Sequence, residues 1–339
     1  MLRFIPFFLL ATSFLIGNPA VGISSPLREI TPDAGPRVLG GWDMFWTADF
    51  IYWTPRVDGL AASLSTVSES GGEGSVYNPH WKWSPGFKVG LGSNLDRDGW
   101  DTSLDFTWIE SQAKRNVRVD NLLPLWNIAN QYTNPTPGEI YASALSWNWW
   151  MNTFDMDLGR NFFVSPYLKL RPFIGLKTAF GIQKYAVQYT RTVSVHVEVK
   201  DTMNNNFHYF GAGPRAGANA AWQFSEEWSL YSDASASLLW SNFRGTRKDT
   251  SQQIPFSQNS SVTSLKTKNR FNTCKPVFEI ALGLRWEIWF SDDDYHFLMQ
   301  GGWEEQLWPS YNEVFKTTEQ GAHGDLITQG MTIHFRFDF

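Results

Sequence analysis

The segment Asp325–Phe339 constrains the fold more than any other part of the chain. Its odd positions, from Ile327 onward, are almost all apolar, whereas its even positions are mostly small, polar or charged. Side chains in a β-strand point alternately to opposite faces, so this pattern predicts a strand with one apolar and one polar face. Such a strand, left at the edge of an open sheet, would template aggregation. A closed barrel removes the problem because its last strand pairs with its first.

The same alternation recurs along the chain. We expect strands at residues 43–54, 81–93, 100–108, 145–159, 167–187, 206–224, 228–242, 275–289, 294–306 and 325–339. Their apolar stretches are about 9–11 residues, the length that a tilted strand needs to cross hydrocarbon. An even strand number with alternating long and short connections is typical of outer-membrane barrels. The prediction is an all-β fold, a closed antiparallel transmembrane β-barrel of about ten strands, with eight and twelve as alternatives.

The connections are expected to be long external loops and short periplasmic turns. Long loops are predicted at 55–80, 111–142, 190–205, 243–273 and 308–324, where the sequence is polar or rich in Pro and Gly. Within the third of these, Val193–Val199 alternates again and would extend a strand beyond the membrane.

Composition favours a lipid-facing protein over a soluble one. Charged residues make up 18% of the chain, below the roughly 25% usual in soluble domains. Aromatic residues reach 16%, with 18 Trp and 26 Phe. Alternation alone does not say which face is outside, so a soluble secreted β-protein is the alternative. The net charge of −5, without a basic block, gives no support for nucleic-acid binding.

The N-terminus has the features of a secretory signal. Arg3 precedes the apolar run Phe4–Gly17, and the small residues Ala20 and Gly22 follow. A membrane anchor is the alternative, but the run is shorter than the roughly 20 residues needed to span. We expect a signal peptide at 1–22, a periplasmic lead-in at 23–41 and the barrel at 42–339. Export through a cleaved signal would deliver the barrel to the outer membrane of a Gram-negative type of bacterium.

The polar faces of the expected strands carry charges of both signs, and we predict that they line an aqueous lumen. The candidate lining residues are Lys82, Lys88, Asp101, Asp105, Lys169, Arg171, Lys177, Arg215, Asp233, Glu279, Arg285, Glu287, His334 and Arg336. An open lumen would pass small hydrophilic solutes or ions. The alternative is ion-paired filling of a narrow or plugged barrel, because a ten-stranded lumen is small.

Catalysis has little support in the sequence. No GxSxG, HExxH or GKS/T stretch is present. His323 and Asp325 are close in sequence, but a pair on a surface loop is the simpler interpretation. Cys274 is the single cysteine, which excludes an intrachain disulfide. We therefore predict no enzyme activity, no cofactor and no metal site.

Two parts of the chain resemble a known family. Residues 49–53 (DFIYW) followed by 58–60 (DGL), and residues 154–165 (FDMDLGRNFFVS) followed by 170–177 (LRPFIGLK), are similar to the Legionella-type major outer membrane protein family and its parachlamydial MOMP-like relatives. The resemblance implies an outer-membrane barrel that acts as a porin or surface antigen. The single cysteine departs from the cysteine-rich chlamydial proteins, which puts a disulfide-linked complex in doubt.

The functional prediction is an outer-membrane porin that allows passive diffusion through its lumen. The alternative is a non-conducting surface barrel whose external loops mediate adhesion or host interaction, and a hydrolase is more distant. The expected partners are outer-membrane lipid, small solutes or ions, and the outer-membrane assembly machinery. That machinery is implied because the strand ending at Phe339 is similar to the terminal strands of bacterial outer-membrane barrels. A homo-oligomer is left open.

Overall fold

The computed structural model describes residues 32–36, 38, 43–66, 73–95, 98–120, 122–128, 139–194, 197–254, 261–314 and 322–339. In these ranges the regular secondary structure is entirely β. The expected signal peptide, 1–22, and most of the lead-in, 23–41, lie outside them. No helix in the described ranges has the length and apolar composition needed to cross a bilayer.

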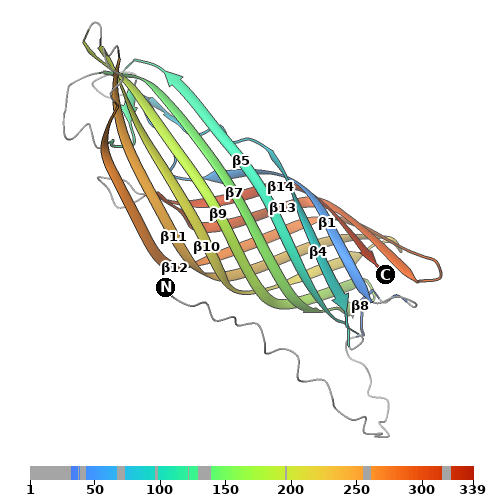
Figure 1. Cartoon of the computed structure of the whole chain (residues 1–339). Coiled ribbons are helices and arrows are strands. Elements are labelled where there is room, and N and C mark those ends of the chain that lie inside the picture. Colours follow the sequence, from blue (N-terminus) through green and yellow to red (C-terminus); the bar gives the residue numbers. More distant parts are fainter. Residues whose placement is uncertain are drawn as a thin grey trace, which may run out of the picture. The chain divides into compact units, whose positions relative to one another are not determined.

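Ten long strands form a closed antiparallel ring (Figure 1). In ring order they are β1 (Met44–Val57), β4 (Ser84–Asn94), β5 (Trp100–Arg118), β7 (Glu139–Arg160), β9 (Leu168–Ser194), β10 (Val197–Gln223), β11 (Trp228–Ile254), β12 (Ser261–Phe290), β13 (Tyr295–Val314) and β14 (Ala322–Asp338). β14 pairs with β13 on one side and with β1 on the other, which closes the ring. The apolar C-terminal strand is therefore not left at an open edge.

Alternation in the sequence becomes alternation between the inside and the outside of the ring. On β7, Trp147 and Asp155 point inward and are buried, whereas Phe154 and Met156 point outward and are exposed. Short turns join the strands at the end of the ring where β1 starts and β14 ends. In the turn between β4 and β5, Gly99 has a φ of 68°, and a Cβ there would lie 2.3 Å from the Asn161 carbonyl oxygen. Only glycine fits that approach without strain.

The ring strands are longer than the sequence predicted, which corrects the expected long loops. β9 and β10 are separated only by residues 195 and 196, although 190–205 was expected to be a loop. Likewise β11 and β12 take up most of 243–273, and β13 and β14 most of 308–324. Each predicted strand ends where its apolar face ends. Beyond the apolar zone the outward face is polar, so the strands continue without the signal that identified them.

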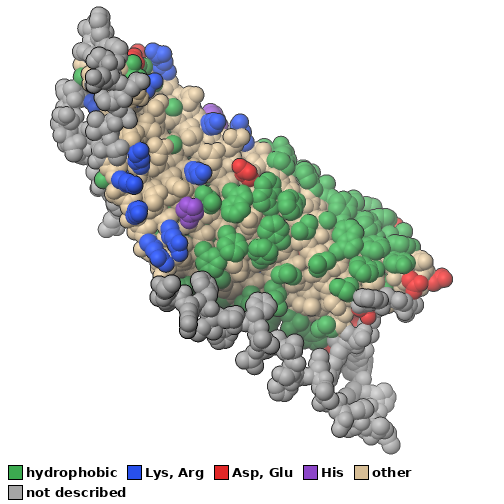
Figure 2. Space-filling model, viewed as in Figure 1, with side chains coloured by type: hydrophobic (Ala, Val, Ile, Leu, Met, Phe, Trp, Pro, Cys, Tyr) green, Lys and Arg blue, Asp and Glu red, His purple; other side chains and the backbone are tan. Residues whose placement is uncertain are grey.

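Large apolar side chains form a belt around the outside of the ring, toward the end with the short turns (Figure 2). Aromatic side chains gather at both margins of the belt. At one margin Tyr52 stacks on Trp83, with ring centroids 5.5 Å apart. At the other margin Tyr295 stacks on Phe337 at 5.8 Å. On β12 the belt runs from Phe278 to Ile288, which at about 3.3 Å per residue and a tilt of about 45° covers roughly 23 Å.

Two of the long connections fold into the other end of the ring. β2 (Ser63–Thr66) pairs with β3 (Gly74–Tyr77) and β6 (Leu122–Pro124) in a small separate sheet. We call residues 58–66, 73–77 and 122–128 the insert. The remaining short strand, β8 (Phe162–Ser165), pairs with the start of β9 at the opposite end.

Candidate functional site: the lumen

The half of the lumen inside the apolar belt holds a polar cavity of about 500 Å³. Its lining comes from all ten ring strands, and also from Asp33–Pro36, Asn161 and Phe163 at the short-turn end. Asp33 forms an isolated β-bridge with Phe162 there. The cavity therefore begins beside the short turns and extends toward the middle of the ring.

Five charged groups hold the centre of this polar cavity together. Lys177 on β9 donates to Asp155 Oδ1 at 2.9 Å and to Glu279 Oε1 at 2.8 Å. Arg215 on β10 donates to Asp157 and, at 2.9 Å, to Glu279 Oε2. The Lys177 side chain is 0% exposed. Because a buried charge without its partner costs several kcal/mol, these groups depend on one another. They join β7 to β12, which are not neighbours in the ring.

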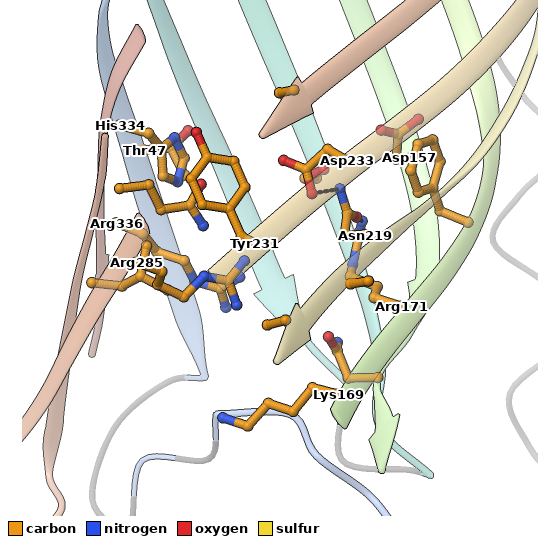
Figure 3. Close-up of a pocket in the computed structure, with 18 of the residues that line it drawn as sticks. Thr47, Asp157, Lys169, Arg171, Asn219, Tyr231, Asp233, Arg285, His334 and Arg336 are labelled. Atoms are coloured by element: carbon orange, nitrogen blue, oxygen red, sulfur yellow. Dashed lines mark hydrogen bonds between the residues drawn. The ribbon is translucent and has the colours of Figure 1, made fainter. Parts of the chain in front are cut away.

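A second network crosses the wall nearer the short turns. Arg171 on β9 donates to both oxygens of Asp101 on β5, with an Nε–Oδ2 distance of 2.8 Å. It also donates to Asn219 Oδ1 at 2.9 Å, and Asn219 Nδ2 donates to Asp233 Oδ1 at 2.8 Å (Figure 3). Three consecutive ring positions, β9 to β11, are thereby tied to β5.

Arg285 differs from the other cavity cations because no carboxylate in the described ranges forms an ion pair with it. When the Gln300 amide is oriented so that both its oxygen and its nitrogen have suitable partners, its side-chain oxygen accepts from Arg285 Nη2 at 2.7 Å and from Nε at 2.8 Å. Figure 3 shows its guanidinium group beside that of Arg336. Arg336 itself donates to Asp338 Oδ1 at 2.6 Å. Arg285 is therefore held by a neutral amide, in the combined field of Asp233, Glu287 and Arg336.

Beyond the cavity a large cluster of apolar side chains fills the lumen, beside buried ion pairs such as Arg191 with Asp201 and Lys275 with Glu313. We call this cluster the apolar plug: Ile51, Trp53, Val57, Leu60, Ala62, Ile109, Ala113, Trp126, Ile128, Leu145, Trp147, Trp149, Met151, Ala179, Tyr185, Val187, Tyr189, Met203, Phe207, Tyr209, Leu239, Phe243, Val277, Trp308, Tyr311, Val314 and Leu326. None of them is more than 6% exposed, and every ring strand except β4 contributes. These side chains bury one another and leave little room for water in their part of the lumen.

The insert supplies the centre of the apolar plug. Trp126 Nε1 donates to the Ala61 carbonyl oxygen at 2.8 Å, and the Trp126 ring lies 5.2 Å from that of Tyr185. Tyr185 donates its hydroxyl to the Leu60 carbonyl at 2.9 Å, and Tyr189 donates to the Ala62 carbonyl. Both tyrosines lie beyond the apolar belt, and burial raises the pKa of each above the ordinary value. Their hydroxyls therefore stay protonated and can anchor the insert to β9.

Trp53 and Lys88 mark the boundary between the cavity and the plug. Trp53 Nε1 donates to Thr332 Oγ1 at 3.1 Å, and Thr332 donates to Glu304 Oε2 at 3.0 Å. Lys88 Nζ donates to Glu304 Oε1 at 2.6 Å, and this ammonium group lies 5.0 Å from the Trp53 ring centroid. One chain of contacts thus connects the last polar layer to the first apolar one.

The structure brings most of the sequence-predicted lining residues together. Eleven of them line the polar cavity: Lys88, Asp105, Lys169, Arg171, Arg215, Asp233, Glu279, Arg285, Glu287, His334 and Arg336. Asp101 and Lys177 point inward but are buried under the lining. Lys82 is a correction: it precedes β4, is exposed and lies outside the cavity. The expected strand began too early at 81, because the Trp81–Trp83 alternation precedes the first ring pairing at Ser84.

Several cavity residues were missed by the sequence reading. Asp49, Asp155, Asp157, Glu304 and His296 all line the cavity. Strand parity alone could have found them, because each lies an even number of residues from another inward-facing position on its strand. The plug gave no such signal. Its aromatic residues lie partly in segments that were expected to be loops, and nothing local says that those segments fold inward.

A closed ring of strands with an apolar outer belt and a charged interior defines the class of this molecule: an all-β protein built to separate lipid from a polar interior. The chain belongs to the family described as Legionella pneumophila major outer membrane protein precursor, whose model matches residues 35–339. It is thus a member of a family of outer-membrane proteins. No curated protein matches it.

Three solved structures that match this chain are distant from it in sequence. The outer membrane protease OmpT from Escherichia coli is 10% identical over 87% of this chain and 96% of its own, with a TM-score of 0.43. The CymD monoaromatic hydrocarbon channel is 9% identical over 88% of both chains, with a TM-score of 0.33. A major outer membrane protein from Thermus thermophilus is 11% identical over 86% of this chain and 99% of its own, with a TM-score of 0.26. None is close enough to indicate what this chain does.

Proposed function

We propose that this protein is a β-barrel that spans the outer membrane with its apolar belt in lipid. The roughly 23 Å covered by the belt on β12 is comparable to the apolar band of about 25 Å on known membrane barrels. Aromatic pairs at both margins, Tyr52 with Trp83 and Tyr295 with Phe337, fit the aromatic girdles that mark the two interfaces. By the same rule the short turns face the periplasm and the insert faces outward.

Within this barrel we propose a lumen that is closed at rest, so that the protein is a surface barrel with a rigid outer end. The observation that carries this proposal is the apolar plug, which packs the outer half of the lumen from wall to wall. The plug favours the non-conducting alternative over a general porin whose lumen is always open. The rigid outer end would then be the part that meets host or neighbouring surfaces.

A gated porin is the second candidate function. The polar cavity favours it, because about 500 Å³ lined by ionised groups would admit small hydrophilic solutes from the periplasmic side. Passive diffusion through the whole barrel would then require the insert to leave the lumen.

Planar-bilayer recording of the refolded full-length chain separates the two candidates. We expect no sustained conductance from the wild-type protein at moderate voltage. Stepwise, long-lived openings without any mutation would overturn the closed-lumen proposal and establish the porin. A size-matched open porin in the same bilayers controls for insertion and recording conditions.

We also propose that the protein is not an enzyme and needs no cofactor. Asp325, one of the pair considered from sequence, accepts a hydrogen bond from the Ser310 backbone N–H at 2.8 Å, which is a structural role for a connection. A lipid environment, assembly through the C-terminal strand, and a cleaved signal belong to the same proposal. Measuring the size of the protein in detergent would show whether it forms a homo-oligomer.

A further inference from the structure

Basic side chains gather on the outward face of β9–β12, just beyond the apolar belt (Figure 2). We call this group the basic patch. Its members are all exposed and come from four adjacent strands: Lys184, His208, Arg244, Lys248, Lys266, Lys268 and Arg270. The patch is outside the lumen and plays no part in the networks of the polar cavity.

Strand register places like charges directly beside each other in the patch. Arg244 on β11 lies opposite Arg270 on β12, and opposite His208 on β10. Lys248 on β11 lies opposite Lys266 on β12. Like charges at directly opposed positions destabilise a sheet, so this arrangement is unfavourable unless an anion lies over it.

The protein supplies no such anion in the part of the chain that the structure describes. No ion pair there joins a member of the patch to a carboxylate. The interleaved outward positions are neutral: Arg244 Nε donates to Asn242 Oδ1 at 3.0 Å, and Asn242 donates to Asn272. Of the acidic side chains on these strands beyond the belt, Asp201 and Asp249 are buried on the inward face, and Glu198 on β10 accepts a hydrogen bond from the Tyr141 hydroxyl at 2.7 Å.

The patch lies at the depth of lipid headgroups. Trp240, which is 61% exposed, is the last apolar belt residue on β11, and Arg244 follows four positions later. At about 3.3 Å per residue and a tilt of about 45°, Arg244 is roughly 9 Å above Trp240 along the membrane normal. On β9, Lys184 is the first outward residue after Ile182. By the same arithmetic Lys248, with Lys266 opposite it, is roughly 19 Å above Trp240. The patch therefore faces sideways and extends from headgroup depth outward along the strands.

We propose that the basic patch binds the phosphate groups of a phosphorylated glycolipid in the outer leaflet of the membrane. The proposal rests on the membrane placement given under Proposed function. Guanidinium groups match phosphate oxygens in two-point contacts, and cationic side chains next to an apolar belt are attracted to anionic headgroups. The bound phosphates would lie between Arg244, Arg270 and Lys248 and remove the repulsion among them. The acyl chains of the same lipid would then cover the belt below.

The test uses the full chain in non-ionic detergent, titrated with bisphosphorylated lipid A and followed by native mass spectrometry. The patch variant is Arg244→Ser/Lys248→Ser/Arg270→Ser. The control, Arg56→Ser/Lys114→Ser/Arg118→Ser, removes the same charge from exposed outward positions on β1 and β5. We expect the patch variant to bind lipid A about tenfold more weakly and the control to stay within about twofold of wild type. Enzymatically dephosphorylated lipid A should lose affinity for wild type by a similar factor.

Three results would overturn the proposal. One is equal binding of phosphorylated and dephosphorylated lipid A. Another is an unchanged affinity in the patch variant, with its native far-ultraviolet circular dichroism retained. The third is tight binding of heparin or of low-millimolar inorganic phosphate that excludes lipid A, which would assign the patch to a soluble anion. Flotation with neutral vesicles is measured separately, so that failure to enter lipid refutes the membrane placement itself.

Discussion

The two halves of the lumen are built on the same strands and are filled in opposite ways. Inside the apolar belt, the inward positions carry ionised groups such as Lys177 and Glu279, and space is left among them. Beyond the belt, most of the buried inward positions around the insert carry apolar groups such as Trp147 and Tyr189, and the charges among them, such as Arg191 and Asp201, are closely paired. The outward faces change in the reverse sense, from apolar to polar. The chemistry of the inner wall is therefore independent of the surroundings of the outer wall.

This difference assigns a separate task to each half. Ion pairs across the polar cavity connect strands that are not neighbours and keep the ring in shape where lipid surrounds it. Apolar packing around the insert holds the insert within the outer half, beyond the apolar belt. A variant that acts on one half should leave the other intact, and three experiments can show whether it does.

The largest effect is expected from emptying the plug. Leu60→Ala/Trp126→Ala/Ile128→Ala removes three buried side chains of the insert, each worth about 2–5 kcal/mol of packing. The insert should undock, and stepwise conductance should appear in planar bilayers where the wild type shows none.

The matched control for the plug variant removes the same three residue types from the lipid face, as Leu238→Ala/Trp240→Ala/Ile280→Ala. This control should remain closed. If the plug variant is folded and equally silent, the insert is not what closes the lumen, and the contrast between the halves fails.

The second experiment acts on the polar half. Lys177→Met removes the fully buried cation between Asp155 and Glu279, so that Arg215 is left to balance both carboxylates and that of Asp157. It should reduce the free energy of unfolding by about 3–5 kcal/mol. Lys169→Met is the comparison, because Lys169 is 26% exposed and its partner Glu287 keeps a hydrogen bond from Gln223. Lys169→Met should reduce the free energy of unfolding by about 1 kcal/mol. Guanidinium chloride unfolding in detergent measures both.

Equal losses for Lys177→Met and Lys169→Met would mean that the central network is solvated and carries no special weight. Neither variant should open the lumen, since the plug is untouched. Conductance from Lys177→Met would show instead that the two halves are coupled.

The smallest effect is a change with pH in how firmly the insert docks. Tyr185 and Tyr189 donate as neutral phenols, and burial raises their pKa above the value of about 10 expected in the unfolded chain. Their contribution is complete below pH 10 and is lost as the pH rises from about 10 through the raised folded-state pKa. Docking should therefore be constant from pH 7 to 9 and weaken above about pH 10.

Thiol labelling measures this docking. A thiol introduced by Ala62→Cys is buried in the insert, while native Cys274 is exposed and serves as the internal reference at each pH. The labelling ratio of the two should rise above about pH 10. In a Tyr185→Phe/Tyr189→Phe background the ratio should be higher throughout and flat; a rise that persists there would exclude these two hydroxyls as its cause.

The sequence predicts the structure correctly where the polarity of each residue matches its immediate surroundings. Phe278, Ile280 and Leu282 alternate with Glu279 and Ala281, and this alternation predicts a strand with two unlike faces. The low charge and high aromatic content of the chain then favour lipid on the apolar side. The prediction failed where the surroundings of a strand change along its length. Past Trp240, β11 is polar outside and mixed inside, so the apolar signal ended at a point where the strand continued to Ile254.

The sequence by itself determined an all-β chain with one apolar face, ten alternating segments and a set of charges on the opposite face, because period-two alternation is a local property of the backbone. Only the tertiary structure decided that Lys177 meets both Asp155 and Glu279, that Lys82 lies outside the cavity, and that Trp126 is buried in the apolar plug. The physical reason is that pairing across a ring and the inward folding of a loop join residues far apart in the chain. Their energies depend on closure, which no single stretch of sequence contains.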